Sequence, residues 1–353
     1  MNQSFITVLE ASVEDRRGLF FSTANRLGVP FQNIEKDFWV CFVLDILFNY
    51  RTESSPRLLF KGGTSLSKAY SLISRFSEDI DITVFREDLK LTMPLDELVQ
   101  LSGKQQRKYF DKIKSASQHY ICNELKPHLQ SVLDGVFETL SNFSEVPSVV
   151  IDESDASHQT LLLKYPSLHN EPSYVFPIVK IECGAKSALD PNSAMTIKPY
   201  VADDMQDPLF TVDNVVTIEA ERTFWDKIII LHGIRRWFDI KGVLRQNGHR
   251  YSRHYYDVFK LLHSDTGEKA FGRQELAIDC SEHAQIFFNS AALDLKTAYV
   301  GTFSIVPSTW MIKELKRDYE AMSGMIFGEV PTFDEVIETI SVFERKLNSD
   351  IGL

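Results

Sequence analysis

Residues 61–66 read Lys61-Gly62-Gly63-Thr64-Ser65-Leu66 and, after ten further residues, the chain reads Ser77-Glu78-Asp79-Ile80-Asp81-Ile82. Side chains two positions apart on a β-strand share a face, so Asp79 and Asp81 point the same way while the two isoleucines point into a core. Two carboxylates aimed at one spot repel each other unless a cation joins them, and carboxylate oxygens attract hard divalent Mg²⁺ or Mn²⁺. The pattern therefore predicts an acidic strand that holds a divalent metal ion.

The turn upstream of this strand predicts a phosphate site. Because glycine lacks a Cβ, Gly62 and Gly63 let the backbone come close to a phosphate, and the hydroxyls of Thr64 and Ser65 add donors beside the backbone N–H groups. Lys61 is interpreted equally well as a phosphate contact and as a surface lysine at a strand end. A phosphate cradle beside paired carboxylates indicates nucleotidyl transfer from a nucleoside triphosphate, which needs metal ions and positioned cations around the leaving pyrophosphate.

A second strand, over residues 174–183, carries a candidate third metal ligand. Sites with two metal ions normally need a carboxylate beyond an Asp-x-Asp pair, and Glu182 can meet Asp79 and Asp81 across the sheet. Lys180 shares the face of Glu182 and is a candidate phosphate contact. The alternative is that the two side chains form a solvated surface pair with no part in chemistry.

Two later helices carry further candidates. Arg222, Asp226 and Lys227 fall within about one turn of each other, and Arg253 and Asp257 are spaced i, i+4 on the next helix. In a functional interpretation Lys227 faces the triphosphate, Asp257 orients it, and Arg222 also contacts the nucleotide. In a structural interpretation Arg253 and Asp257 form a helix pair of a few tenths of a kcal/mol, and Lys227 is a solvated end.

The segment between these helices is basic and aromatic. Cations with stacking aromatics suit a flexible RNA end, whereas helix C-termini collect basic residues for dipole reasons, and the sequence does not decide between the two. The candidate RNA contacts are Arg235, Arg236, Lys241, Arg245, Arg250 and Arg253, with Asp239 as the one acid among them.

Bulk properties limit the class of protein. A net charge of −11 over 353 residues argues against wholesale coating of nucleic acid, so an RNA partner needs a local basic patch. The four cysteines lie far apart without Cys-x-x-Cys spacing, which is typical of reduced thiols. No signal peptide is visible, and the longest apolar run, residues 38–48, is too short to cross a bilayer. We therefore expect a cytoplasmic protein without membrane contact.

Hydrophobic periodicity predicts an α+β chain, with strands among the first 183 residues and helices over most of the C-terminal part. A proline-punctuated segment, residues 188–210, suggests a core over residues 1–210 and a helical domain over 211–353 that completes the active site. The first fifty residues are expected to be helical, with a strongly apolar helix over residues 34–48. The other expected helices cover 64–75, most of 89–143, 219–237 and most of 253–348. The expected strands cover 58–60, 78–85, 160–164 and 174–183, with a loop or irregular edge over 144–157.

In combination these motifs resemble the AbiEii/AbiGii-type nucleotidyltransferase toxins of abortive-infection and type IV toxin–antitoxin systems. The resemblance spans roughly residues 34–260. It rests on Glu35-Lys36-Asp37-Phe38-Trp39-Val40, the glycine turn at 61–66, Phe76 to Ile82, the helix from Glu221 to Lys227, and Arg253 to Asp257.

The resemblance implies a DNA polymerase β-like nucleotidyltransferase core, in which helices flank a small mixed sheet, and metal-dependent use of a nucleoside triphosphate. In characterised branches of the family, nucleotides are transferred to the 3′ end of tRNA, which blocks translation. It also implies phage defence and a separately encoded antitoxin. By position in the motifs, Gly63, Thr64 and Ser65 would contact phosphates, Asp79 and Asp81 would hold metal, and Lys227 and Asp257 would complete the site.

The chain departs from the family pattern in two places. His254 stands where the family usually has an aspartate, and the interval from Lys227 to Asp257 is longer than usual, through an insertion that covers much of the basic segment. Two alternatives stay open: transfer to a small molecule or protein, and a silent nucleotide-binding protein. A small-molecule acceptor predicts a small enclosed acceptor pocket. Nucleotide titration with and without metal, followed by a turnover assay, identifies the silent protein.

Overall fold

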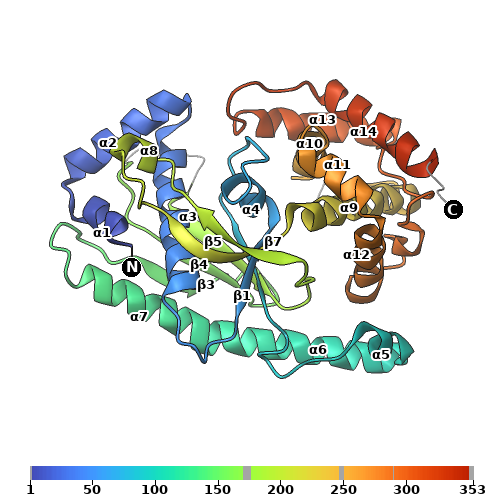
Figure 1. Cartoon of the computed structure of the whole chain (residues 1–353), viewed down its shortest axis with the longest axis horizontal. Coiled ribbons are helices and arrows are strands. Elements are labelled where there is room, and N and C mark those ends of the chain that lie inside the picture. The colour runs from blue at the N-terminus through green and yellow to red at the C-terminus, as the bar shows by residue number, and fades with distance from the viewer. Residues whose placement is uncertain (1, 170–175, 246–249, 289, 350–353) are drawn as a thin grey trace. The chain divides into compact units, whose positions relative to one another are not determined.

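A computed structural model describes residues 2–169, 176–245, 250–288 and 290–349 (Figure 1). Its contacts divide the chain into two compact units. Unit 1 consists of Met1–Ala69 and Phe76–Ile218, and unit 2 consists of Tyr70–Arg75 and Glu219–Leu353. The short segment between the glycine turn and the acidic strand thus belongs to the unit formed by the C-terminal half. We expect a domain boundary at residue 210, between parts that fold independently, and this expectation stays a prediction.

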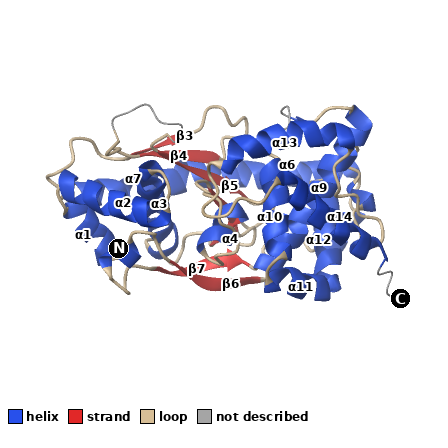
Figure 2. Cartoon of the chain, turned by 90° about the horizontal axis from the view of Figure 1, so that it is seen from above, coloured by secondary structure: helices blue, strands red, loops and turns tan. Residues whose placement is uncertain are grey.

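Unit 1 is built on one seven-stranded mixed sheet in the order β3-β4-β5-β2-β1-β7-β6. Figure 2 labels β3, β4 and β5 on one side of this sheet and β7 and β6 on the other. The pairs β2–β5 and β1–β7 are parallel, and the other four pairs are antiparallel. The expectation of a mixed sheet flanked by helices is confirmed. The strands are β1 Leu58–Lys61, β2 Ile80–Val84, β3 Ser148–Ile151, β4 Thr160–Lys164, β5 Ile178–Gly184, β6 Asn192–Ile197 and β7 Val212–Ile218.

Helix α3 forms the core of unit 1 against this sheet, where it contacts β5 and β7. The helix is buried from Asn33 to Leu47, and Phe38, Trp39 and Phe42 are at most 2% exposed. Its charged side chains Glu35, Lys36, Asp37 and Asp45 are buried as well. The helices of unit 1 are α1 Gln3–Glu10, α2 Val13–Leu27, α3 Phe31–Asn49, α4 Gly62–Lys68, α5 Leu95–Gln100, α6 Gly103–Tyr120, the π-helix Ile121–Leu125, α7 Lys126–Phe137 and α8 Ala202–Met205.

Unit 2 is helical, as expected for the C-terminal part, and α9 is its centre. This helix contacts α10, α11 and α12, and it buries Phe224 and Trp225 completely. The helices are α9 Ala220–Lys241, α10 Ser252–Leu262, α11 Asp265–Gly272, α12 Gln274–Phe287, the 3₁₀ helix Leu295–Thr297, α13 Thr309–Ser323 and α14 Phe333–Ser349. Among the described residues, no helix has the length and apolar character of a bilayer-spanning segment.

Several predicted elements differ from the structure. The helix expected over residues 64–75 ends at Lys68, and Ser71 has a φ of 54°, which a continuing α-helix does not allow. The segment expected to be a loop or irregular edge contains edge strand β3. Sequence periodicity also missed β6 and β7. The first two residues of the strand expected at 174–183 lie outside the described residues.

Strand β6 was missed because it is the opposite edge of the sheet. Its residues are mostly exposed or half-buried, so the strand shows no apolar alternation. It lies in the proline-punctuated segment and pairs with β7, and the ladder shifts between Met195 and Ile197. Partner strands, which periodicity does not reveal, define such an edge.

Candidate active site

The glycine turn and the acidic strand meet in the middle of the sheet of unit 1. Strands β1 and β2 are antiparallel neighbours, and the register places Lys61 opposite Asp81. Phe60, Ile80 and Ile82 are fully buried, which fixes the register because a slip by one residue would turn every side chain to the other face. The turn that follows β1 is therefore held directly beside the carboxylate of Asp81.

Gly62 packs so closely against the Asp81 side chain that a Cβ on this residue would require that side chain to shift. A Cβ at this position would lie 2.1 Å from Oδ2 and 2.8 Å from Cγ of Asp81. The φ of Gly62 is +82°, a conformation that side-chain-bearing residues rarely adopt. The predicted phosphate turn and the predicted metal strand thus form one packed element.

The hydroxyls of Thr64 and Ser65 are buried and bind within this element. Ser65 Oγ donates to the Gly62 carbonyl oxygen at 2.9 Å. Thr64 Oγ1 donates to the Asp79 carbonyl oxygen and lies 2.9 Å from Ser77 Oγ. The Thr64 hydroxyl therefore holds the turn to the start of the acidic strand, and the Ser65 hydroxyl closes the turn on itself. Because both hydroxyls are engaged, the backbone N–H groups are the expected donors for a phosphate.

The predicted third carboxylate lies on the neighbouring strand. Parallel pairing of β2 with β5 places Glu182 opposite Asp81, and residues opposite each other in a ladder share a face. Two lysines accompany these carboxylates: Lys180 Nζ lies 2.6 Å from Glu182 Oε1, and Lys61 Nζ lies 3.8 Å from Asp81 Oδ1. Lys180 and Glu182 do pair, and their side chains are 34% and 43% exposed.

The donor chemistry of this face fits a hard divalent cation, because Asp81 and Glu182 offer oxygen ligands on adjacent strands. Within the described residues, no group of three or more His, Cys, Asp or Glu side chains is arranged to hold a metal ion. Glu182 would therefore have to release Lys180 before it could bind a metal ion as the third carboxylate.

Sequence reasoning gave no role to Glu35, Lys36 and Asp37 on α3, and the structure shows what they contact. Lys36 Nζ donates to Glu78 Oε2 at 2.6 Å, directly beside the acidic strand. Asp37 is 3% exposed and accepts from Lys68 Nζ at 2.6 Å, at the end of the helix that follows the glycine turn. Helix α3 therefore anchors both the turn and the strand, which only the tertiary fold reveals.

Glu35 binds a different segment. Its carboxylate accepts from Ser167 Oγ at 2.7 Å and from the Leu168 N–H at 2.6 Å. These three consecutive side chains therefore fix three separate parts of unit 1 to one buried helix.

In unit 2, Lys227 and Asp257 form a buried cluster with Arg75. Lys227 Nζ donates to Asp257 Oδ2 at 2.8 Å. Arg75 donates to both carboxylate oxygens, from Nε to Oδ1 at 2.7 Å and from Nη2 to Oδ2 at 2.9 Å. The side chain of Asp257 is 0% exposed and that of Lys227 is 7% exposed, so Lys227 is not a solvated helix end.

Burial and charge set the protonation of this cluster. Burial alone would raise the pKa of Asp257, but the charges of Arg75 and Lys227 hold that pKa well below its usual range. Burial lowers the pKa of Lys227, and Asp257 opposes this effect. Burial, followed by the charge of Lys227, lowers the pKa of His254 well below its ordinary value. Nδ1 of His254 has no hydrogen-bond partner among the described residues, so this position now holds a neutral ring.

Arg222 lies inside unit 2. Its side chain is 2% exposed and donates from Nη1 to Asp279 on α12, and its Nε lies 3.9 Å from Asp226 Oδ1. Arg222 therefore joins α9 to α12. A role in nucleotide binding stays a prediction.

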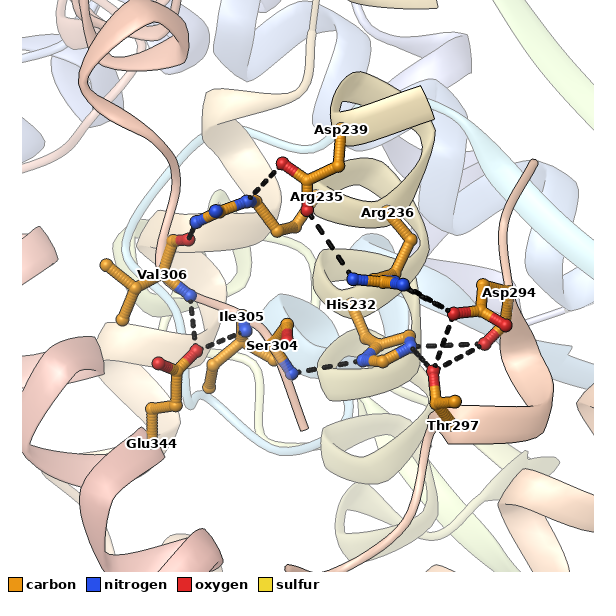
Figure 3. A network of polar contacts seen from close by, with 10 residues as sticks. All are labelled: His232, Arg235, Arg236, Asp239, Asp294, Thr297, Ser304, Ile305, Val306 and Glu344. Atoms are coloured by element: carbon orange, nitrogen blue, oxygen red, sulfur yellow. Dashed lines mark hydrogen bonds and ion pairs between the residues drawn. The ribbon is translucent and has the colours of Figure 1, made fainter. Parts of the chain in front are cut away.

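Two of the basic residues predicted to contact RNA take part in a network inside unit 2 (Figure 3). Arg235 donates from Nε to Asp239 at 2.9 Å and from Nη1 to the Val306 carbonyl oxygen at 2.7 Å. Arg236 donates to Asp294 Oδ2 at 2.9 Å from Nε. These contacts fix α9 to the segments that follow α12.

The remaining basic residues differ in their surroundings. Lys241 and Arg245 are exposed, and both lie over the Trp237 ring, with the Arg245 guanidinium 4.9 Å from its centre. The backbone N–H of Arg250 donates to Asp318 Oδ1 at 2.7 Å. Arg253 is half-buried on α10. Two exposed cations that lie over one aromatic ring are thus found at the end of α9 and just after it.

A cavity of about 780 Å³ lies in unit 2, lined by residues of α10, α11 and α14 and by residues 329–331. None of the predicted site residues lines it. The predicted site residues themselves divide between the units: the turn, the acidic strand and β5 belong to unit 1, and Arg222, Lys227 and Asp257 belong to unit 2. Within the buried cluster of unit 2, Arg75 is the residue that sequence reasoning missed, although it stands four positions before Asp79.

Comparison with known proteins identifies the family. The profile of the family described as nucleotidyl transferase AbiEii toxin, type IV toxin–antitoxin system, matches residues 45–339. The match covers the glycine turn, the acidic strand and both later helices but begins after residues 35–40. No curated protein matches the chain by sequence.

Among solved structures the chain is similar to MenT4, a nucleotidyltransferase toxin from Mycobacterium tuberculosis H37Rv. The identity is 12%, the TM-score is 0.43, and the alignment covers 94% of this chain and 97% of that chain. With a TM-score this low, the assignment rests on the sequence profile. The chain therefore belongs to the AbiEii family of nucleotidyltransferase toxins of type IV toxin–antitoxin systems.

Proposed function

We propose that this nucleotidyltransferase moves a nucleoside monophosphate from a nucleoside triphosphate to an RNA, with the 3′ end of tRNA as acceptor. Modification of that end would block translation and would make the protein toxic to its host, in phage defence or in another response. The proposal includes a divalent cation, Mg²⁺ or Mn²⁺, as cofactor and the cytoplasm as the place of action.

The packing of Asp81 over Gly62 is the observation that carries the proposal. A Cβ on Gly62 would stand 2.1 Å from the Asp81 carboxylate, so the backbone of the turn and the carboxylate share one small space. A triphosphate bound by the turn would have its phosphates within reach of a cation held by Asp81. Proximity of this kind is what phosphoryl and nucleotidyl transfer require, because positioning and charge supply most of the catalysis.

We assign the residues of unit 1 as follows. Asp79, Asp81 and Glu182 would hold the cation, which when bound would neutralise charge on the transferred phosphate. The backbone at Gly62 and Gly63 would receive the phosphates, and Thr64 and Ser65 would keep the turn in place. Lys61 and Lys180, whose ammonium groups already lie near these carboxylates, would move to phosphate oxygens when the cation is present.

In unit 2 we assign Lys227 to the triphosphate and Asp257 to the orientation of Lys227. One of the three ammonium protons of Lys227 is directed to Asp257, and no other described residue accepts from this nitrogen. The remaining N–H groups are therefore available to a phosphate. Arg222 stays a proposed nucleotide contact, and its bond to Asp279 would fix the position of α9.

For the acceptor we propose that Lys241, Arg245, Arg250 and Arg253 contact the RNA backbone. Arg235 and Arg236 would support them from within the fold, because their guanidinium groups already bind carboxylates and a carbonyl oxygen. A separately encoded antitoxin is the expected partner of a toxin of this family.

The test is incubation of the purified protein with Mg²⁺, each labelled nucleoside triphosphate in turn and total bacterial RNA. We expect label in RNA of tRNA size with wild type and none with Asp79→Ala or Asp81→Ala. Arg57→Gln is a matched control, because Arg57 lies in unit 1 and its ion pair with Glu87 is exposed.

No incorporation of any nucleotide by folded, nucleotide-binding protein would overturn transfer to RNA. Transfer to a small molecule or to a protein, or a silent pocket, would then remain. Label in RNA from the Asp81→Ala variant would overturn the role of that carboxylate.

A further inference from the structure

Arg75 lies in the short segment Tyr70–Arg75, which belongs to unit 2 although its neighbours in sequence belong to unit 1. The segment is attached to unit 2 by its backbone as well. The Phe327 N–H donates to the Ser74 carbonyl oxygen at 2.7 Å, and Arg75 forms an antiparallel bridge with Ile326. The backbone that carries the Arg75 side chain is therefore held within unit 2.

The guanidinium of Arg75 grips Asp257 through both oxygens. The two N–H···O distances are 2.7 and 2.9 Å, and paired contacts of this kind fix the plane of a carboxylate as well as its position. Lys227 Nζ then binds Oδ2 of that fixed carboxylate at 2.8 Å. The direction of the Lys227 ammonium thus depends on the plane that Arg75 sets.

A lysine alone would leave this plane free to rotate. Lys227 makes a single contact to Asp257, and an ammonium is a point charge without the forked geometry of a guanidinium. The Asp257 side chain is 0% exposed, so side chains and not bulk water satisfy its charge in the folded protein. Loss of the guanidinium would leave a buried carboxylate with one partner and an undefined orientation.

We infer that Arg75 is a positioning residue of the transfer reaction, which orients Lys227 toward the triphosphate by fixing the carboxylate of Asp257. The inference rests on the proposed role of Lys227 and adds a residue that acts through it. Arg75 is not assigned any contact with substrate.

The test is a double-mutant cycle in the full-length protein, in which nucleotide affinity and turnover are measured for each variant. Arg75→Met, Lys227→Met and the double variant are titrated with each Mg²⁺–nucleoside triphosphate, and transfer to RNA is measured in parallel. Arg75→Lys keeps the charge but not the paired contact. Arg273→Met is the matched control, because Arg273 lies in unit 2 and its contact with Glu219 is 46% and 31% exposed.

We expect Arg75→Met to weaken nucleotide binding roughly tenfold and to slow turnover by up to roughly 100-fold, as misplaced catalytic groups do. In the Lys227→Met background the same change should weaken binding by less than about twofold, because residues that act as one unit are not additive. Arg75→Lys should recover only part of the loss, and Arg273→Met should bind and turn over as wild type.

A purely structural role gives a different pattern. If all variants are folded by circular dichroism at the assay temperature and Arg75→Met binds nucleotide as wild type, or weakens it equally in both backgrounds, the inference is wrong. Failure of the proposed function gives a different result, which is seen without any change at Arg75. If the wild-type protein transfers no nucleotide and Lys227→Met binds nucleotide as tightly as wild type, the assignment of Lys227 is wrong, whatever the effect of Arg75.

Discussion

Replacement of Gly62 by alanine tests the packing on which the proposed site depends. The added Cβ would lie 2.1 Å from Asp81 Oδ2, 2.8 Å from Cγ and 3.1 Å from Cβ, on a backbone with a φ of +82°. Alanine in a left-handed conformation costs about 1–2 kcal/mol, and an overpacked contact costs about 1–3 kcal/mol more. The expected loss of unfolding free energy is therefore about 2–5 kcal/mol.

Gly28 provides the matched control. It caps α2 with a φ of +66°, and a Cβ there would meet nothing within 4 Å. Gly28→Ala should therefore cost only the conformational part, about 1–2 kcal/mol. The difference between the two variants, measured by urea unfolding with unchanged slopes, isolates the contact with Asp81.

The same change should impair catalysis beyond its effect on stability. An ordinary contact needs about 3.4 Å where only 2.1 Å is present, so the Asp81 carboxylate has to move by more than 1 Å. A displacement of this size costs up to roughly 100-fold in rate when the displaced group takes part in the reaction. Equal stability losses for Gly62→Ala and Gly28→Ala, with nucleotide transfer at the wild-type rate, would refute both the packing and the role of Asp81.

Three further predictions concern other parts of the chain. Burial lowers the pKa of His232, so the free energy of unfolding should decline as the pH falls below about 6.5, where the unfolded chain takes up a proton that the folded one does not. In urea unfolding from pH 7.5 to 5, His232→Gln should lose part of this pH dependence. If the variant keeps the full pH dependence, another group causes it. Asp37→Ala leaves Lys68 buried without its carboxylate and should lower the free energy of unfolding by about 3–5 kcal/mol. The double variant Asp37→Leu, Lys68→Met should restore most of this loss. If urea unfolding shows no recovery in the double variant, the loss does not come from the unpaired charge. The double variant Lys241→Gln, Arg245→Gln should weaken RNA binding and reduce its salt dependence without a change in melting temperature. If the affinity for RNA is unchanged, this segment is not part of the RNA site.

Local patterns predicted the centre of unit 1 well. Alternation of apolar and acidic residues placed Asp81 on a strand, and glycine placed the turn before it. Both signals depend on a few consecutive residues, whose backbone conformation follows from their own side chains. The register of Asp81 with Glu182 also follows an expectation from sequence, that a second strand presents its carboxylate on the same face.

The contacts of unit 2 could not be predicted in the same way. Arg75 and Asp257 are 182 positions apart, and no periodicity in either segment reveals the other. Spacing suggested Arg253 as the partner of Asp257, because i, i+4 neighbours on a helix lie close together. The hydrogen bonds of the Asp257 carboxylate come instead from Arg75 and Lys227, which only tertiary packing brings to it.

The basic segment shows a second limit of sequence reasoning. Charge along the chain does not reveal which cations already have a partner in the fold. Arg235 and Arg236 bind Asp239, Asp294 and a carbonyl oxygen, and Asp294 lies 58 positions from Arg236. A count of basic residues therefore overstates the charge that is available to a polyanion.

Each unit contains a buried ion pair of a kind that stability alone does not explain. Lys68 and Asp37 are 4% and 3% exposed, and Asp257 is fully buried between Arg75 and Lys227. Removal of such charges from water costs several kcal/mol per ion, and well-packed apolar residues of similar size are often as stable or more stable. What apolar residues cannot do is fix the direction of an ammonium group. In unit 1 the pair joins α3 to the end of the helix that begins at the glycine turn, and in unit 2 it sets the direction of Lys227. Both pairs therefore hold in place the residues to which we assign the chemistry, and this is the physical reason for burying charge there.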